Sequence, residues 1–201
     1  MVHPQTDWWF CRHGESTANA GGWLSGWDDV PLTSLGEAQA RARAEAAAAL
    51  PFRRCLTSDL GRARDTARHL LSLRPDVVVH VEPALRERNM GELQGFPVSA
   101  LRPGSAERRT LRTWDQAPPG AETPAVLVAR ALAALRRWDD GTPTLVVAHG
   151  ALVRNVLGVI DGRNPQEFLE EAAADHVVLH ARRVDLRTVV PPPARGGLGK
   201  L

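Results

Sequence analysis

WWFCRHGES, residues 8–16, joins an apolar run to a cluster of reactive side chains. Trp8 to Cys11 is compact and apolar, which is typical of a buried β-strand, and the residues that follow are polar. The same arrangement recurs downstream, where three more short apolar runs end in polar residues. These further predicted strands are Arg54–Thr57, Val77–Val81 and Thr144–Ala148.

Helical stretches separate the predicted strands. The expected helices are Leu35–Leu50 with a capping box of Ser34 and Glu37, a helix capped by Ser58 that runs to Leu73, a helix from N-cap Thr123 and Pro124 to Gly141, Ala151–Ile160, and a short helix at Asn164-Pro165. Two last strands, His176–His180 and Val184–Val190, are expected to form a hairpin. Strands that alternate with helices indicate an α/β fold with a mostly parallel central sheet flanked by helices on both faces.

The domain organisation is expected to be simple. Residues 1–190 are predicted to form a single domain, and residues 191–201, which contain Pro-Pro-Pro and Gly-Gly, a disordered tail. Within the domain, the stretch from about 82 to 120 holds five prolines and four glycines. Such a stretch is too long for a simple connection, so we interpret it as a short lid insertion.

Composition excludes several classes of protein. Hydrophobic residues make up 43% of the 201 residues and the formal charge is +2, as expected of a globular domain. Lys200 is the sole lysine and no long basic run appears, so nucleic acid is not an expected partner. Because neither a signal-peptide core nor a membrane-spanning run is visible, a cytoplasmic location without membrane contact is expected. Cys11 and Cys55 lie in apolar stretches and are predicted to be buried free thiols.

The polar clusters that follow the strands supply two histidines, two arginines and a glutamate. Arg12 and His13 follow the first strand, Arg62 comes after the second, Glu87 after the third and His149 after the fourth. In open α/β sheets, ligands bind beyond the carboxyl ends of the strands. We therefore expect these five side chains to meet at one edge of the sheet.

Those side chains suit phosphoryl transfer. Guanidinium groups bind phosphate oxygens through paired hydrogen bonds, and neutral imidazole is a competent nucleophile near neutral pH. A carboxylic acid can protonate the leaving oxygen. Helix N-termini after Ser58 and Gly150 are expected to add backbone donors for an anion. The set stabilises the transferred group without a metal ion, and no spacing of His, Cys, Asp or Glu matches a common metal motif.

The ordered motifs from about residue 7 to residue 160 resemble those of the histidine phosphatase superfamily, which includes cofactor-dependent phosphoglycerate mutases. The motifs are Arg12-His13-Gly14-Glu15-Ser16 with Asn19, Ser25-Gly26-Trp27 with Asp29, Thr57-Ser58-Asp59-Leu60-x-Arg62-Ala63 with Thr66, Leu85-x-Glu87-Arg88 with Gly91-x-Leu93-Gln94-Gly95, Pro118-Pro119-Gly120-Ala121-Glu122-Thr123, and Val146-Val147-Ala148-His149-Gly150 with Arg154. Any one tripeptide is weak, whereas the ordered set is specific.

The resemblance implies a role for each matching position. His13 would be the phosphorylated nucleophile and Glu87 the proton donor and acceptor, with Glu82 and Glu92 as alternatives. Arg12, Arg62 and His149 would bind the phosphoryl group. Substrate-binding residues would be Asn19, Ser25, Gly26, Arg88 and Gly150. The resemblance implies that no metal is needed. No cofactor is expected for this chain, and the expected partner is a small phosphate ester; a homodimer stays open.

Three functions remain in competition. The leading hypothesis is a phosphomonoesterase that works through phosphohistidine at His13. A phosphoglycerate mutase is the first alternative, although only about two dozen residues separate Gly95 from Glu122 and none is lysine, whereas the mutases are expected to carry a longer insertion there. A non-catalytic phosphate-binding module is the second. The lid arginines 102, 108, 109 and 112 are either grips for a second acidic group or solvated surface, and we favour solvated surface.

Overall fold

The computed structural model describes residues 5–172 and 175–194, so most of the predicted tail lies outside the described residues. The strands are β1 Thr6–Arg12, β2 Arg54–Thr57, β3 Val78–Val81, β4 Thr144–Ala148 and β5 Leu179–Val184. The helices are α1 Thr17–Gly21, α2 Ser34–Ala42, α3 Ala44–Ala48, α4 Gly61–Leu70, α5 Ala106–Leu111, α6 Pro124–Arg137, α7 Gly150–Ile160 and α8 Pro165–Glu170.

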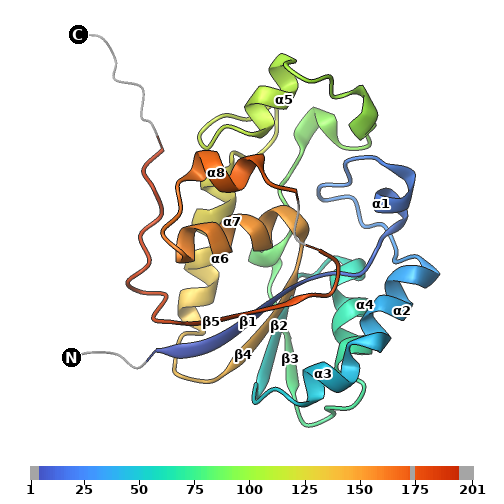
Figure 1. Cartoon of the computed structure of the whole chain (residues 1–201), viewed down its shortest axis with the longest axis vertical. Coiled ribbons are helices and arrows are strands. Elements are labelled where there is room, and N and C mark those ends of the chain that lie inside the picture. The colour runs from blue at the N-terminus through green and yellow to red at the C-terminus, as the bar shows by residue number, and fades with distance from the viewer. Residues whose placement is uncertain (1–4, 173–174, 195–201) are drawn as a thin grey trace.

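The strands form one sheet in the order β3-β2-β4-β1-β5. The β2–β3, β2–β4 and β1–β4 pairs are parallel, and β5 alone runs antiparallel, beside β1. Helices α6 and α7 lie on one side of the sheet and α2, α3 and α4 on the other, as Figure 1 shows. The predicted α/β architecture with a mostly parallel sheet is therefore confirmed.

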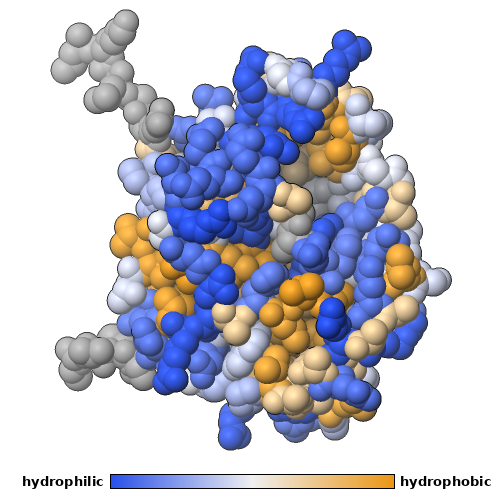
Figure 2. Space-filling view, viewed as in Figure 1, coloured by the Kyte–Doolittle hydropathy of each residue, from blue (hydrophilic) through white to orange (hydrophobic). Residues whose placement is uncertain are grey.

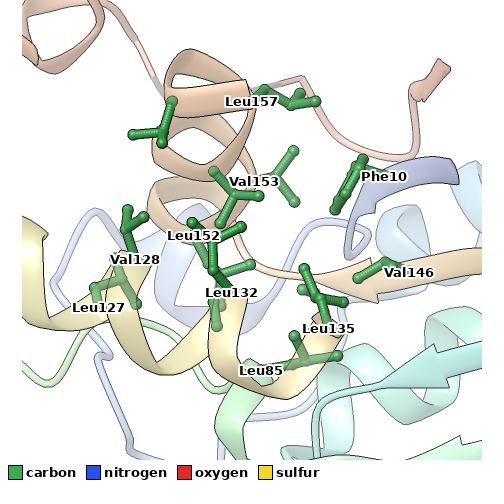
Figure 3. Close-up of a cluster of buried hydrophobic side chains, with 14 of the residues drawn as sticks. Phe10, Leu85, Leu127, Val128, Leu132, Leu135, Val146, Leu152, Val153 and Leu157 are labelled. Atoms are coloured by element: carbon green, nitrogen blue, oxygen red, sulfur yellow. The ribbon is translucent and has the colours of Figure 1, made fainter. Parts of the chain in front are cut away.

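The two faces of the sheet bury two separate hydrophobic clusters. Along β1, Trp8 and Phe10 enter the cluster beneath α6 and α7, part of which is drawn in Figure 3. Trp9 and Cys11 enter the cluster beneath α2 and α4. Because successive side chains of a strand point to opposite faces, a strand covered on both sides must be apolar throughout, as residues 8–11 are. The outer surface seen in Figure 2 is largely hydrophilic, with hydrophobic residues in separate patches.

Several predicted helix boundaries were wrong. The stretch 35–50 forms two helices that meet at Arg43, and the N-cap is Thr33 rather than Ser34, because the Thr33 hydroxyl accepts the Gly36 N–H. After β2, the helix starts at Gly61, because the Ser58 hydroxyl accepts the Leu60 N–H in a turn that precedes it. The Thr123 cap and Pro124 start of α6 are confirmed, although α6 ends at Arg137.

The predicted hairpin at the C-terminal end was also wrong. The described residues there form one strand, β5, which pairs with β1 from Thr6↔Val184 to Cys11↔Leu179. Beyond it the chain turns at Asp185, whose carbonyl accepts the Thr188 N–H. Leu186 and Val189 then pack into the cluster beneath α6 and α7. The apolar residues Leu186 and Val189 thus reflect burial of a turn rather than a second strand.

The segment 82–120 carries more regular structure than its composition suggests. It contains the 3-10 helices η1 Pro83–Leu85, η2 Gly91–Leu93 and η3 Val98–Ala100 in addition to α5. Backbone bonds attach it to the loop after α1: Leu24 N–H donates to the Phe96 carbonyl and Gly95 N–H donates back to the Leu24 carbonyl. The segment therefore packs on the loop that holds Ser25 and Gly26, which is compatible with a lid.

Cys11 and Cys55 are buried free thiols, as predicted. Burial raises the pKa of the Cys11 thiol to about 12 and that of Cys55 further. None of the helices in the described part of the chain combines the length and apolar character that a bilayer-spanning helix needs.

Candidate active site

The predicted catalytic side chains gather at the carboxyl ends of three neighbouring strands. In the sheet order, β4 lies between β2 and β1, so His149 after β4 is flanked by His13 after β1 and by the turn after β2 that leads to Arg62. The His13 N–H donates to the Ala148 carbonyl, which extends the β1–β4 pairing into the site. The convergence expected from the sequence is present.

His13 is held by its own backbone neighbour. Its Nδ1 lies 2.6 Å from the Gly14 carbonyl oxygen, and because a carbonyl only accepts, Nδ1 must carry the proton. The Nε2 lone pair is then available for attack. Burial first, and the charges of Arg62 and Arg12 next, hold the pKa of His13 well below its usual value. The side chain is 4% exposed and neutral at physiological pH.

His149 lies next to His13 and has two unused ring nitrogens. The ring centroids are 5.2 Å apart at 64°, and His149 is the N-cap residue of α7. The side chain is fully buried, and among the described residues neither Nδ1 nor Nε2 has a hydrogen-bond partner. Burial and Arg62 lower the pKa of His149 as well. Buried polar atoms are normally paired, so these two nitrogens mark a place for a ligand.

Arg62 is 1% exposed, and within the described residues its guanidinium group has both bonded and unbonded nitrogens. Nη1 donates to the Asp28 carbonyl and Nη2 to the Gly26 carbonyl, both at 2.8 Å, while Nε has no partner among the described residues. Arg12, partly buried, completes the cationic cluster; burial lowers the pKa of both arginines and the Glu87 carboxylate opposes that shift. Two guanidinium groups beside two neutral imidazoles form a site for an anion.

Glu87 sits at the start of α7. Its Oε2 accepts the Ala151 N–H at 3.1 Å, and its Oε1 accepts the N–H groups of Leu152 and Arg88. The alternatives point elsewhere: Glu82 binds Arg137, and Glu92 is exposed. Among the three candidates, Glu87 is the carboxylate beside His149.

The two helix N-termini that the sequence assigned to an anion are largely occupied by carboxylates of the chain. Glu87 takes the second and third amides of α7, and Asp29 Oδ1 accepts the Gly61 N–H at the start of α4 at 2.6 Å. The Gly150 amide makes no hydrogen bond among the described residues, so it can still serve a ligand. The prediction of two helix termini for the phosphate thus reduces to the Gly150 amide.

Of the remaining predicted substrate-binding residues, three lie in loops joined to the segments of the site and one is bonded within the protein. The Asn19 Oδ1 accepts bonds from Ser16 in the cap of α1, which leaves its amide nitrogen for a ligand. Ser25 and Gly26 lie in the loop that Arg62 holds. Arg88, however, is 3% exposed and donates to the carbonyls of Glu122, Leu111 and Gln116. The structure does not support a substrate-binding role for Arg88.

Sequence reasoning missed two contributors to this region. Arg130 on α6 donates to the Glu87 carbonyl and forms a two-point pair with Glu122, so it fixes the backbone beneath the acid. His176, which the sequence placed only at the start of a predicted strand, has its Nδ1 2.7 Å from the His13 carbonyl oxygen. The motif that contains Glu122 was a sequence signal for the role of Arg130. No motif in the sequence singles out His176.

The chain resembles proteins of two activities. The sequence pattern of the histidine phosphatase superfamily (branch 1) matches residues 8–187. A 2,3-bisphosphoglycerate-dependent phosphoglycerate mutase of Gloeobacter violaceus is 38% identical over 170 residues, which cover 78% of this chain and 76% of the relative. A mycobacterial glucosyl-3-phosphoglycerate phosphatase has a TM-score of 0.75 at 27% identity, over 88% of this chain and 89% of that one. A mycobacterial hydrolase has a TM-score of 0.78 at 26% identity, over 88% and 90%. With its two histidines, two arginines and glutamate at one edge of the sheet, the chain belongs to the histidine phosphatase superfamily.

Proposed function

We propose that this protein is a phosphomonoesterase that hydrolyses a small phosphate ester through a phosphohistidine at His13. One observation carries the proposal: the Nδ1–H of His13 is fixed on the Gly14 carbonyl, which leaves Nε2 unprotonated in a residue that lies beside Arg12, Arg62 and His149. A nucleophile fixed as one tautomer beside an anion site is the arrangement that covalent phosphoryl transfer requires.

In the first step, Nε2 of His13 attacks phosphorus and the bond from phosphorus to the ester oxygen breaks. Glu87, in its acid form, gives its proton to the departing alkoxide. Arg12, Arg62 and His149 bind the three equatorial oxygens, where negative charge is concentrated in the transition state. Burial of both imidazoles strengthens these charge interactions because little water competes for them.

In the second step, water attacks the phosphohistidine. Glu87 as carboxylate accepts the proton of that water, the phosphorus–nitrogen bond breaks, and inorganic phosphate leaves. The three backbone N–H bonds to Glu87 keep its carboxylate oriented at the edge of the site. This division of one difficult displacement into two easier ones is the benefit of a covalent intermediate.

The state of the lid arginines supports hydrolysis over isomerisation. Arg108 and Arg109 donate to the carbonyls of Leu101 and Gly104 in their own segment, and Arg112 pairs with Glu170. A mutase must hold its intermediate product through a second transfer and keep water out. Arginines that are bonded to their own segment or to α8 do not provide such a grip in this arrangement.

A phosphoglycerate mutase remains the second candidate function, because the mutase of Gloeobacter violaceus shares 38% identity with this chain. Mutase and phosphatase would use the same phosphohistidine and differ in which acceptor takes the phosphoryl group.

Measuring which acceptor takes the phosphoryl group from the phosphohistidine distinguishes the mutase from the phosphatase. The enzyme is given 3-phosphoglycerate with a trace of 2,3-bisphosphoglycerate, and free phosphate and 2-phosphoglycerate are followed together. We expect phosphate to form faster than the isomer. Faster formation of the isomer would reverse the ranking, and a panel of metabolite phosphates extends the assay if 3-phosphoglycerate is not a substrate.

Chelator and vanadate test the chemistry of the site independently of the substrate. No group of three or more His, Cys, Asp or Glu side chains in the described ranges is placed to hold a metal ion, so activity should be unchanged by EDTA. Vanadate, found in a complex of the mycobacterial phosphatase, should inhibit by filling the cationic cluster. Loss of activity in EDTA with recovery on adding a divalent metal would contradict this chemistry.

A further inference from the structure

The peptide that joins His13 to Gly14 is held from both sides by side chains distant in the sequence. On one side, Nδ1 of His176 donates to the His13 carbonyl at 2.7 Å. On the other, the Gly14 N–H donates to Oγ1 of Thr66 at 3.0 Å, and the Thr66 hydroxyl donates in turn to the Arg62 carbonyl. Both polar groups of this one peptide are therefore bonded to side chains.

The orientation of this peptide affects the nucleophile directly. The next carbonyl along the chain, that of Gly14, is the acceptor that fixes Nδ1 of His13. Gly14 itself is tightly enclosed, since a Cβ at this position would lie 2.3 Å from the Gly36 carbonyl oxygen. Rotation of the 13–14 peptide would swing the Gly14 carbonyl away from the imidazole and release the tautomer.

The residue that follows His176 has an energetically unfavourable backbone conformation. Val177 has φ +52°, which is rare for a β-branched residue. Such strain persists only where surrounding contacts determine the conformation, and it concentrates at functional sites. Here the Val177 side chain is 1% exposed, and its N–H donates to the Arg12 carbonyl at 3.0 Å. This backbone conformation brings His176 against His13, with ring centroids 5.8 Å apart.

His176 enters this contact as a neutral side chain. Burial lowers its pKa, and the hydrogen-bonded carbonyl of His13 requires the proton on Nδ1. The contact is thus a directional N–H bond from a group without full charge. His176 neither replaces His13 nor adds a charge to the cationic cluster of Arg12 and Arg62.

We propose that His176 is a positioning residue for the nucleophile: together with Thr66 it fixes the His13–Gly14 peptide, and so holds His13 in the tautomer that attacks phosphorus. The inference depends on the proposed function only in taking His13 as the nucleophile. It predicts that His176 affects the phosphorylation step and not the binding of the phosphate group.

The test compares His176→Ala, which lacks the donor, with His176→Asn, whose short side-chain amide keeps an N–H. The matched control is His180→Ala, because His180 is partly buried, has a lowered pKa and pairs with β1 at Phe10 rather than with the His13–Gly14 peptide. In single-turnover phosphorylation we expect His176→Ala to be slower by about tenfold to a hundredfold, as for a misplaced reacting group. His176→Asn should recover much of the rate, and vanadate affinity should stay within about threefold in all variants.

A second readout does not require turnover. Nitrogen-15 NMR of the His13 ring should show one Nδ1-protonated tautomer in the wild type and in His180→Ala, and a mixture of tautomers in His176→Ala. If the wild type hydrolyses no phosphate ester, the proposed function fails while the NMR comparison still decides this inference. Wild-type phosphorylation and a single tautomer in His176→Ala would overturn it.

Thr66 provides an independent variant should His176→Ala not fold. Thr66→Val removes the acceptor of the Gly14 N–H, whereas Thr66→Ser keeps it. The Val variant should mix the His13 tautomers and the Ser variant should not. Combined with His176→Ala, Thr66→Val should cost less than the sum of the two single effects, because both side chains fix one peptide. Strict additivity would contradict the shared role.

Discussion

At the scale of single residues, burial determines the chemistry of His13 and His149. Both imidazoles are surrounded by protein and by arginine charges, so their pKa values are lowered and each is neutral where an exposed histidine would be partly protonated. The two differ in their bonds. His13 has its Nδ1 committed to Gly14, whereas neither nitrogen of His149 has a partner among the described residues. The first is therefore suited to attack and the second to hold the phosphoryl group.

His13→Ala should reduce turnover by about 10³-fold or more, because loss of a covalent nucleophile leaves only binding and electrostatic stabilisation. The measurement is kcat with the best substrate from the phosphate-release assay, with thermal unfolding to verify the fold. A variant that keeps more than about a tenth of the wild-type rate would remove His13 from the nucleophile role.

Glu87→Gln should impair phosphorylation in proportion to how poorly the alcohol leaves. An alkyl phosphate needs the proton that Glu87 supplies, whereas the phenolate of an activated aryl phosphate departs unaided. Single-turnover phosphorylation with both substrates, alongside Glu92→Gln as the matched control, measures the difference. Equal losses on the two substrates would assign Glu87 a structural role through its bonds to Ala151 and Leu152.

Functional residues could be predicted from the sequence where a motif contained them, but the contacts between residues could not. His13, Arg12, Arg62 and His149 are recognisable from short motifs that each follow a strand. Two contacts depend on the path of segments far apart in the sequence. They are the bonds of Arg88 to three carbonyls and the bond of His176 to His13. Neither a motif nor a periodicity encodes such contacts, because they arise only when the chain is folded.

At the scale of elements, α7 links the sheet to the acid. It begins where β4 ends, so its N-terminal amides face the carboxyl edge of the sheet and bind Glu87. The partial positive charge of a helix N-terminus favours a carboxylate at this position. Arg130 on α6 then fixes the backbone of Glu87 from the other side, together with Glu122.

Arg130→Ala should destabilise the protein by about 3–5 kcal/mol, because it leaves the largely buried Glu122 without its cationic partner. The side chains of the pair are 20% and 14% exposed. The matched control is Arg68→Ala, whose pair with Asp65 is 66% and 44% exposed and should contribute about 0–1 kcal/mol. Urea unfolding measures both. Equal, small losses would show that the pair does not hold the segment that carries Glu87.

Element types were predictable more securely than their ends. Apolar runs identified β1, β2, β3 and β4 within a residue or two. The central strand β4 is apolar because both of its faces are buried, whereas β3 is an exposed edge strand that its valines identified. The break at Arg43 and the late start of α4 depend on turns whose hydrogen bonds no pattern reveals. The false hairpin arose because Leu186 and Val189 are apolar for packing into the cluster beneath α6 and α7 rather than for strand pairing.

At the scale of the whole molecule, the parallel order of the sheet creates the site. Parallel strands bring their carboxyl ends to one edge, so loops from residues 12, 58, 87 and 149 meet although they are far apart in the sequence. This feature follows from alternation of strands and helices and could be predicted. The position of β5, antiparallel at the edge next to β1, could not, because any edge would accept a single added strand.

Stability should fall as the pH is lowered from about 6.5 towards 5. The folded-state pKa values of His13 and His149 lie below the value of an exposed histidine, so in this window the unfolded chain binds protons that the folded protein excludes. Each such histidine contributes a slope of up to about 1.4 kcal/mol per pH unit. Urea unfolding at several pH values measures the slope, which His149→Asn should reduce. A slope that is the same in the variant would contradict the buried neutral state.

The most direct test of a phosphohistidine at His13 is to isolate it. Enzyme and an activated aryl phosphate are mixed, quenched in alkali, where phosphohistidine survives, and digested for mass spectrometry; Glu87→Gln is included because it should slow the hydrolysis step and raise the yield. The mechanism predicts one phosphoryl group on the peptide that contains His13, present within the first turnover and absent from His13→Ala. Phosphate release without label on that peptide, or label on the peptide that contains His149, would contradict it.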